Sequence, residues 1–179
     1  MKTHHLLIHI CMASVLAFLS ACTTPNPPHT DVSIDSVFVT ADLHFYGAHY
    51  ENIPQNVMSM TLLSNGLQRD SLLGISGYGT ILCLSDILIS PTDSSLQSGS
   101  YTIDTTALSN TIFPGVCFER MLSGAYLLRL GRYSRDTLLF SSGEMLVTAL
   151  GGDSIMLDLS LQSDKVRYHG MYHGIIPSR

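Results

Sequence analysis

The stretch Ser154-Ile155-Met156-Leu157-Asp158-Leu159-Ser160-Leu161 decides the fold that we predict for this chain. Its branched apolar residues recur at every second position, and Asp158 and Ser160 occupy positions between them. A period of two is typical of a β-strand with one buried face. The preceding Gly151-Gly152-Asp153 is a turn sequence, and residues 144–150 form a second strand pattern. The stretch therefore predicts a β-hairpin over 144–161.

Further strand patterns occupy most of the chain upstream of this hairpin. The first runs over 37–45, where we expect a single dry face made of Val37, Val39, Ala41, Leu43 and Phe45. Met58, Met60 and Leu62 alternate with polar residues in a second strand, and Asn65-Gly66 then provides a turn. Residues 81–89 are apolar on both faces apart from Ser85 and Asp86, which is typical of a central strand. Shorter strands are expected near 101–103, 112–113, 125–130 and 166–176.

These strands are short, numerous and separated by turn residues, and no helical pattern of three turns follows residue 22. Such a series predicts an all-β domain, either a sandwich or a barrel. We predict an antiparallel β-sandwich of about 8–10 strands, because the glycine-rich and proline-rich breaks resemble points where a chain crosses between sheets. A calycin-like β-barrel is the alternative.

The N-terminus has the features of an export signal. Lys2 precedes an apolar run over 6–19, which is too short to span a bilayer and ends in small residues. Leu19-Ser20-Ala21-Cys22 resembles the lipobox of bacterial lipoproteins. That resemblance implies a lipoprotein signal peptide over 1–21 and a lipidated Cys22 at the mature N-terminus. The all-β domain then covers 32–179, and the membrane is reached through acyl chains.

Residues 22–31 form a tether between the lipidated cysteine and the domain. Three prolines in this short polar run favour an extended, semi-rigid spacer. In lipoproteins of the Bacteroides type, acidic residues just after the cysteine often mark export to the cell surface. This tether has none before Asp31, so the resemblance implies an outer-membrane location that faces the periplasm.

Three patterns in the domain extend the resemblance. They are Leu96-x-x-Gly99-x-Tyr101, Ser142-Gly143-x-Met145-x-Val147 and Gly170-x-Tyr172-x-Gly174. With the hairpin over 144–161, they look like the small all-β outer-membrane lipoproteins of Bacteroides-type bacteria. This resemblance implies a fold and a location, and it assigns no catalytic residue.

Composition limits the classes of partner. The 14 acidic and 9 basic side chains give a net charge of −5, and no basic stripe is present. We therefore expect no nucleic-acid partner. A protein or glycan partner in the envelope remains open.

Motifs for catalysis and metal binding are weak. Gly74-Ile75-Ser76-Gly77-Tyr78 fails the G-x-S-x-G pattern at its last position. His169 and His173 lie on one strand face, about 13 Å apart at the rise of a strand, which is too far for one ion. The acidic residues are scattered over turns and single strand positions. We therefore expect a non-enzymatic protein without a metal or cofactor.

Two sets of residues are candidates for special roles. Tyr46, Tyr50 and Tyr78 are candidate ligand contacts, because they lie near turns and sugar sites often use aromatic faces. Cys83 and Cys117 are the two thiols that remain after Cys11 leaves with the signal and Cys22 is lipidated. Export permits a disulfide between them, although Cys83 in its apolar strand also suits a buried thiol.

Three functions follow in order of preference. The first is a lipid-anchored envelope lipoprotein that acts as a binding or structural component. The second is a lipocalin-like carrier of a small apolar ligand, for which the usual Gly-x-Trp signature is missing. The third is a glycan-directed hydrolase, which needs two converging carboxyl groups.

Overall fold

The computed structural model describes residues 32–70, 74–164 and 166–176. The chain divides into two units, residues 1–30 and 31–179, and the described residues belong to the second. The predicted signal peptide, the lipidated Cys22 and the tether lie outside the described residues. Within the described ranges, no helix is long and apolar enough to cross a membrane.

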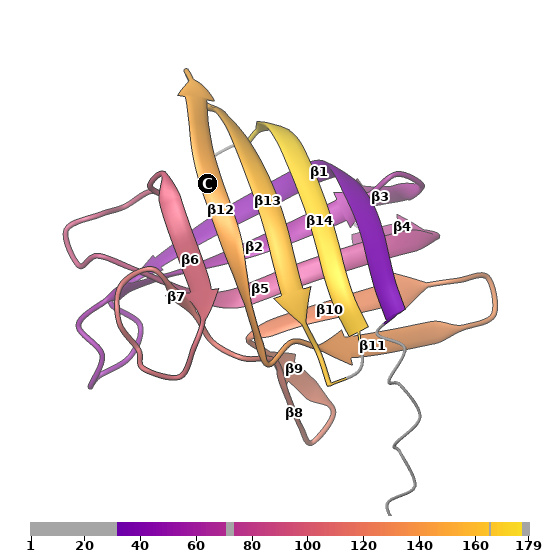
Figure 1. The fold of residues 1–179 in the computed structure, drawn as a ribbon, viewed down its shortest axis with the longest axis horizontal. Coiled ribbons are helices and arrows are strands. Elements are labelled where there is room, and N and C mark those ends of the chain that lie inside the picture. The colour runs from indigo at the N-terminus through magenta and orange to yellow at the C-terminus, as the bar shows by residue number, and fades with distance from the viewer. Residues whose placement is uncertain (1–31, 71–73, 165, 177–179) are drawn as a thin grey trace, which may run out of the picture. The chain divides into compact units, whose positions relative to one another are not determined.

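The regular structure of the described residues is all β, as predicted (Figure 1). It contains fourteen strands, which are β1 (Val32–Gly47), β2 (Asn56–Ser64), β3 (Leu67–Asp70), β4 (Gly74–Gly77), β5 (Gly79–Ile89), β6 (Gly99–Ile103), β7 (Thr111–Ile112), β8 (Val116–Phe118), β9 (Met121–Ser123), β10 (Ala125–Leu130), β11 (Arg135–Leu139), β12 (Ser142–Gly151), β13 (Ser154–Gln162) and β14 (Val166–Ile175).

Eight of these strands close into a barrel, so the predicted sandwich is wrong and the barrel alternative is correct. Their order around the ring is β5-β2-β1-β14-β13-β12-β6-β7, and β7 returns to β5 to close it. β10 and β11 extend the sheet outward from β5. The hairpins β3–β4 and β8–β9 are separate two-stranded sheets.

The physical reason for the barrel is the long first strand. β1 pairs in parallel with β14 over 32–38 and antiparallel with β2 over 38–47. β1 therefore joins the strands on either side of it into one hydrogen-bonded sheet. A sandwich would instead consist of two separate sheets. The β1–β14 pair and the β6–β7 pair are parallel, so the sheet is also not purely antiparallel.

The predicted hairpin is confirmed as β12–β13, with the expected faces. Leu157, Leu159 and Leu161 are buried, whereas Asp158 and Ser160 are exposed. The register pairs Val147 with Leu157 and Met145 with Leu159, which places four apolar side chains together on the inner face of the barrel.

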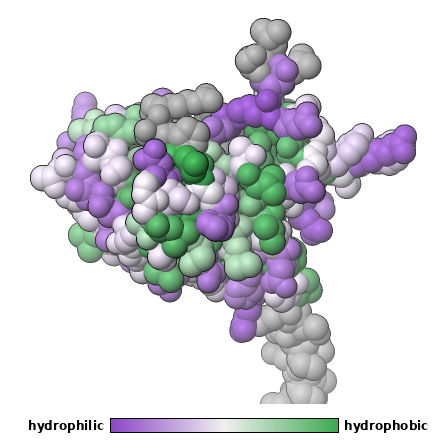
Figure 2. All heavy atoms as spheres, turned by 90° about the horizontal axis from the view of Figure 1, so that it is seen from above, coloured by the Kyte–Doolittle hydropathy of each residue, from purple (hydrophilic) through white to green (hydrophobic). Residues whose placement is uncertain are grey.

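The predicted inner face of β1 is wrong in its first half. Val37 and Val39 are 62% and 55% exposed, and Phe38 between them is buried. A register shift between Phe38 and Thr40 adds one residue to the pairing with β2 and reverses the alternation. From Ala41 onward the predicted face is the buried one. Outward positions are thus not uniformly polar, and Figure 2 shows apolar and polar residues intermixed on one face of the molecule.

The barrel interior is filled with side chains. Leu62, Leu82, Leu84, Met145 and Leu157 have 0% exposure and belong to one hydrophobic cluster with Tyr101 and Phe140. A ligand-sized void beside these side chains would leave them accessible surface, and they have none. The described interior is therefore a packed core, which does not favour the carrier with an internal pocket.

Phe38 lies at the point where β1 meets both of its neighbours. It is paired with Tyr172 of β14 and with Ser64 of β2. Its ring lies over Gly170, where an added Cβ would fall 3.0 Å from Phe38 Cε2. Because Gly170 has no side chain, the phenyl ring of Phe38 can lie over it.

We expect Phe38→Ala to lower the free energy of unfolding by about 3–5 kcal/mol, because it empties a buried site at the junction of three strands. The matched control is Val37→Ala, which should change it by about 0.5 kcal/mol or less at an exposed position. Urea denaturation of both variants measures the difference. Equal losses would show that the assigned faces of β1 are wrong.

Candidate functional site

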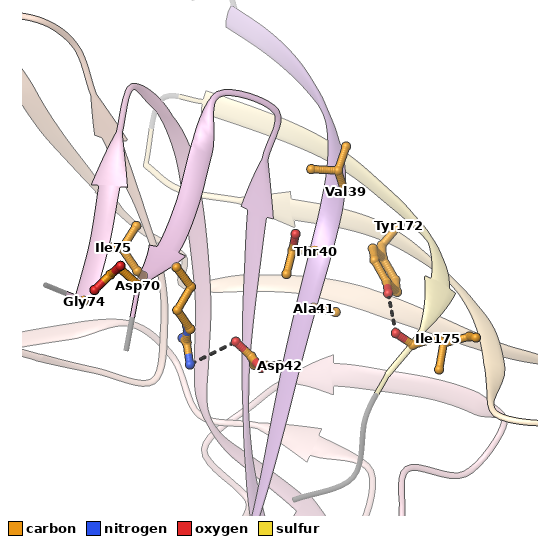
Figure 3. Close-up of a pocket in the computed structure, with 10 residues that line it drawn as sticks. Val39, Thr40, Ala41, Asp42, Asp70, Gly74, Ile75, Tyr172 and Ile175 are labelled. Carbon is orange, nitrogen blue, oxygen red and sulfur yellow. Dashed lines mark hydrogen bonds and ion pairs between the residues drawn. The ribbon is translucent and has the colours of Figure 1, made fainter. Parts of the chain in front are cut away.

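A cleft opens where β1 and β14 separate (Figure 3). Their pairing ends at Phe38 and Tyr172, and beyond that point β1 pairs only with β2. The cleft has a volume of about 1020 Å³. Its lining residues come from β1, from the β3–β4 hairpin and from β14, and are Val39, Thr40, Ala41, Asp42, Arg69, Asp70, Gly74, Ile75, Tyr172 and Ile175. Both apolar and charged groups therefore face this space.

An ion pair crosses the outer side of this cleft. Arg69 Nη1 lies 2.9 Å from Asp42 Oδ2, and the two residues come from β3 and β1. The β3–β4 hairpin is held against the barrel wall by Leu67, which packs with Leu63 and Ile81 in a second hydrophobic cluster. As a result of this packing, Arg69 lies over the outer face of β1.

Two smaller hollows continue the cleft along the barrel wall. The first, of about 270 Å³, lies next to the large cleft and shares Asp42 and Arg69 with it. The second, of about 450 Å³, shares Tyr46, Ser59 and Thr61 with the first. Through these shared residues the three hollows form a series along the outer faces of β1 and β2, which we call the outer groove.

Aromatic rings form a row at one end of the outer groove. Successive ring centroids are 4.5 Å apart for His44 and Tyr46, 5.6 Å for Tyr46 and His49, and 5.0 Å for His49 and Tyr50. The contacts are tilted or edge-to-face, as aromatic pairs prefer. Tyr46 is 49% exposed, so part of its ring is open to a ligand.

Asp86 fixes the position of this aromatic end. Its side chain is buried and accepts hydrogen bonds from Tyr50 Oη at 2.5 Å, Ser123 Oγ at 3.0 Å and Gly124 N at 3.3 Å. Gly124 has φ +71°, and a Cβ there would fall 2.0 Å from Pro114 O. One carboxylate thus ties the loop after β1 to the β9–β10 connection.

Burial and the neighbouring charge keep the hydroxyl groups of this end protonated. Desolvation, followed by the hydrogen bond and the charge of Asp86, raises the pKa of Tyr50 to about 12. Desolvation also raises the pKa of Cys83, against hydrogen bonds from Tyr126 and Thr61. These groups therefore act as neutral hydrogen-bonding partners at ordinary pH, and the Cys83 thiol is a poor nucleophile.

The carboxylates that line the outer groove are those of Asp42, Asp70 and Asp86. Asp42 is paired with Arg69, and Asp86 accepts hydrogen bonds from three donors. Among the described residues, no group of three or more His, Cys, Asp and Glu side chains lies close enough to hold a metal ion.

The structure brings together some of the predicted residues. Tyr46 and Tyr50 both line the aromatic end of the outer groove, whereas Tyr78 is not among the residues that line its three hollows. Cys83 lines the groove, Cys117 lies exposed on β8, and both are free thiols. The structure therefore does not contain the disulfide that the sequence permitted.

Sequence reasoning missed Asp42, His49, Arg69 and Asp86 as members of a site. Asp86 had one signal, since it is the only acidic residue in the apolar stretch 81–89. A buried acid in such a strand needs partners. Asp42 and Arg69 meet only because the β3–β4 hairpin folds over β1, and His49 joins the site through its ring contacts with Tyr46 and Tyr50.

No protein-family model matches the chain, and comparisons with curated proteins and with solved structures also give no match. The function must therefore be inferred from the outer groove and from the sequence itself.

We expect three tyrosines of wild type, Tyr126, Tyr168 and Tyr50, to titrate with a pKa of about 12. The Tyr50→Phe variant should lack one of these three groups, which is Tyr50. Between pH 10 and pH 12 the unfolded chain ionises this tyrosine and the native protein does not. Its contribution to stability is therefore lost as pH rises through that window. A spectrophotometric titration of both proteins checks the assignment. If the variant instead loses a group that titrates near pH 10, the hydrogen bond to Asp86 does not form in solution.

Proposed function

We propose that this protein is a lipid-anchored lipoprotein of the cell envelope that binds a glycan chain in its outer groove. It is non-enzymatic, anchored at the outer membrane through acyl chains on Cys22, and faces the periplasm. The observation that carries the binding proposal is the series of hollows with shared lining residues that runs from the cleft beside β14 to the aromatic row.

The chemistry of the outer groove supports a hydroxyl-rich ligand. Aromatic faces stack on the C–H faces of sugar rings, and Tyr46 offers such a face. Side-chain hydroxyls of Ser59, Thr61, Ser85 and Ser123 line the same end and both donate and accept hydrogen bonds. A few placed polar groups beside aromatic rings are what small-ligand sites use for orientation.

The length of the outer groove supports a chain of sugars. It follows β1 from Val39 to Tyr46, which is about 23 Å at the rise of a strand. That length exceeds a single sugar ring. The ion pair of Asp42 with Arg69 lies in the middle, where its exposed oxygen and nitrogen atoms can bond further hydroxyls.

We expect an oligosaccharide from a panel that includes chitotetraose and cellotetraose to bind the full protein, measured by titration calorimetry in detergent. Tyr46→Ala should then raise Kd about tenfold or more, since it removes the exposed stacking face. Tyr78→Ala is the matched control, because Tyr78 is a 59% exposed tyrosine outside the groove. Equal weakening by both variants, or no binding of any oligosaccharide, would contradict the proposal.

The anchor is tested separately from the outer groove. Mass spectrometry of the purified mature protein should show an acylated residue 22 at the N-terminus, and Cys22→Ala should release the folded protein from the membrane fraction. An intact Met1 or an unmodified Cys22 would contradict the anchor.

A further inference from the structure

We propose that the β8–β9 hairpin inserts the apolar side chains of Val116, Phe118 and Met121 into the interfacial layer of the bilayer and so orients the barrel on the membrane. The inference rests on the lipid anchor proposed above, because that anchor brings the domain to a bilayer. It adds a second, protein-based contact with the lipid.

One face of this hairpin is apolar and unpacked, and its turn consists of the exposed residues Glu119 and Arg120. Phe118 and Met121 are each 68% exposed and Val116 is 53% exposed. Phe118 pairs directly with Met121 across the hairpin, and Val116 lies on the same face. None of the three belongs to either hydrophobic cluster of the described residues. Three apolar side chains therefore project together from a hairpin that adds nothing to the core.

The turn of this hairpin has an unfavourable backbone. Its two central residues, Glu119 and Arg120, have φ of +48° and +69°. Hairpin turns with two positive φ values normally use asparagine and glycine, because a Cβ is costly in this region. This strained turn places Phe118 and Met121 side by side at an exposed position.

The start of the domain lies on the side from which the hairpin projects. In Figure 1 the beginning of β1 and the β8–β9 hairpin both lie toward the lower edge of the barrel. Cys22 precedes Val32 by ten residues, so covalent geometry keeps β1 within about 35 Å of the anchored cysteine. A bilayer is thus always within reach of this side, which is why we assign the hairpin to lipid.

Arg120 in the hairpin turn places a cationic side chain next to the apolar face, beside Glu119. Arg129 and Arg135 lie on β10 and β11, and Arg132 lies between these strands. Arg132 also lies 5.2 Å from the ring centroid of Tyr133. Arginine and aromatic residues are favoured at the membrane interface, where long cationic side chains reach the head groups.

Insertion would also set the position of the outer groove. Ser123 ends β9 and binds Asp86 at the aromatic end of the groove. Each strand of the hairpin has three residues, which is about 10 Å at the rise of a strand. A hairpin in the interfacial layer therefore holds the aromatic end close above the head groups.

The chain lacks tryptophan, so one introduced indole reports its own surroundings. We expect the full lipidated Phe118→Trp protein, reconstituted in phosphatidylcholine vesicles, to emit at shorter wavelength than in detergent-free buffer without lipid. Its emission should be quenched by vesicles that contain brominated phosphatidylcholine. The control is the Tyr78→Trp protein, whose emission should be neither shifted nor quenched. Adding Met121→Ser to Phe118→Trp should reduce the quenching.

Each outcome has a distinct meaning. Lipidated protein that floats with vesicles while the Phe118→Trp indole stays unquenched would overturn the hairpin inference and leave the anchor intact. Protein that does not float would instead contradict the anchor. A blue shift that appears without lipid and grows with protein concentration would assign the hairpin to self-association, which also overturns the inference.

Discussion

The pairing of β1 with strands from both halves of the chain holds this barrel together. β1 pairs with β14 from Val32 to Phe38 and with β2 from Phe38 to Gly47. Within the described residues, the barrel also closes where the two-residue strand β7 pairs with β5. Antiparallel neighbours in each half follow from local hairpins, whereas the parallel β1–β14 pair joins the first strand to the last. Phe38 over Gly170 fills the inner side of that junction, and the register shift beside Phe38 lets the inner face continue at Ala41.

The same constraint produces the outer groove. Because β1 leaves β14 after Phe38 to follow β2, the wall opens between them, and the β3–β4 hairpin covers one side of the opening. Arg69 then meets Asp42 over β1. The row from His44 to Tyr50 lies further along the same strand and its following loop. Asp86 joins that loop to the β9–β10 connection, so the groups that line the outer groove are positioned by the strand that closes the barrel.

Local patterns were sufficient to predict the all-β class and the β12–β13 hairpin with its inner leucines. They were insufficient to predict the closure of the barrel, because the sequence of Val32–Phe38 does not indicate that this segment pairs with β14. The bulge beside Phe38 could not be predicted either. Val37 and Val39 stand two residues apart and are apolar, as residues on a buried strand face would be. Tyr46 and Tyr50 were predicted as ligand contacts from their place near a turn. Tyr78 has the same local features and lies elsewhere, and Arg69 acquires its partner only through the fold of a separate hairpin.

The central claim is that this barrel binds its ligand on the outer wall and not inside. Methyl and aromatic NMR during titration with an oligosaccharide that binds in calorimetry tests it most directly. The account predicts shifts for the rings of Tyr46 and His49 and for the Thr61 methyl, with the methyl groups of Leu157, Leu159 and Met145 unmoved. Shifts confined to those buried methyl groups, with the groove rings unmoved, would contradict it.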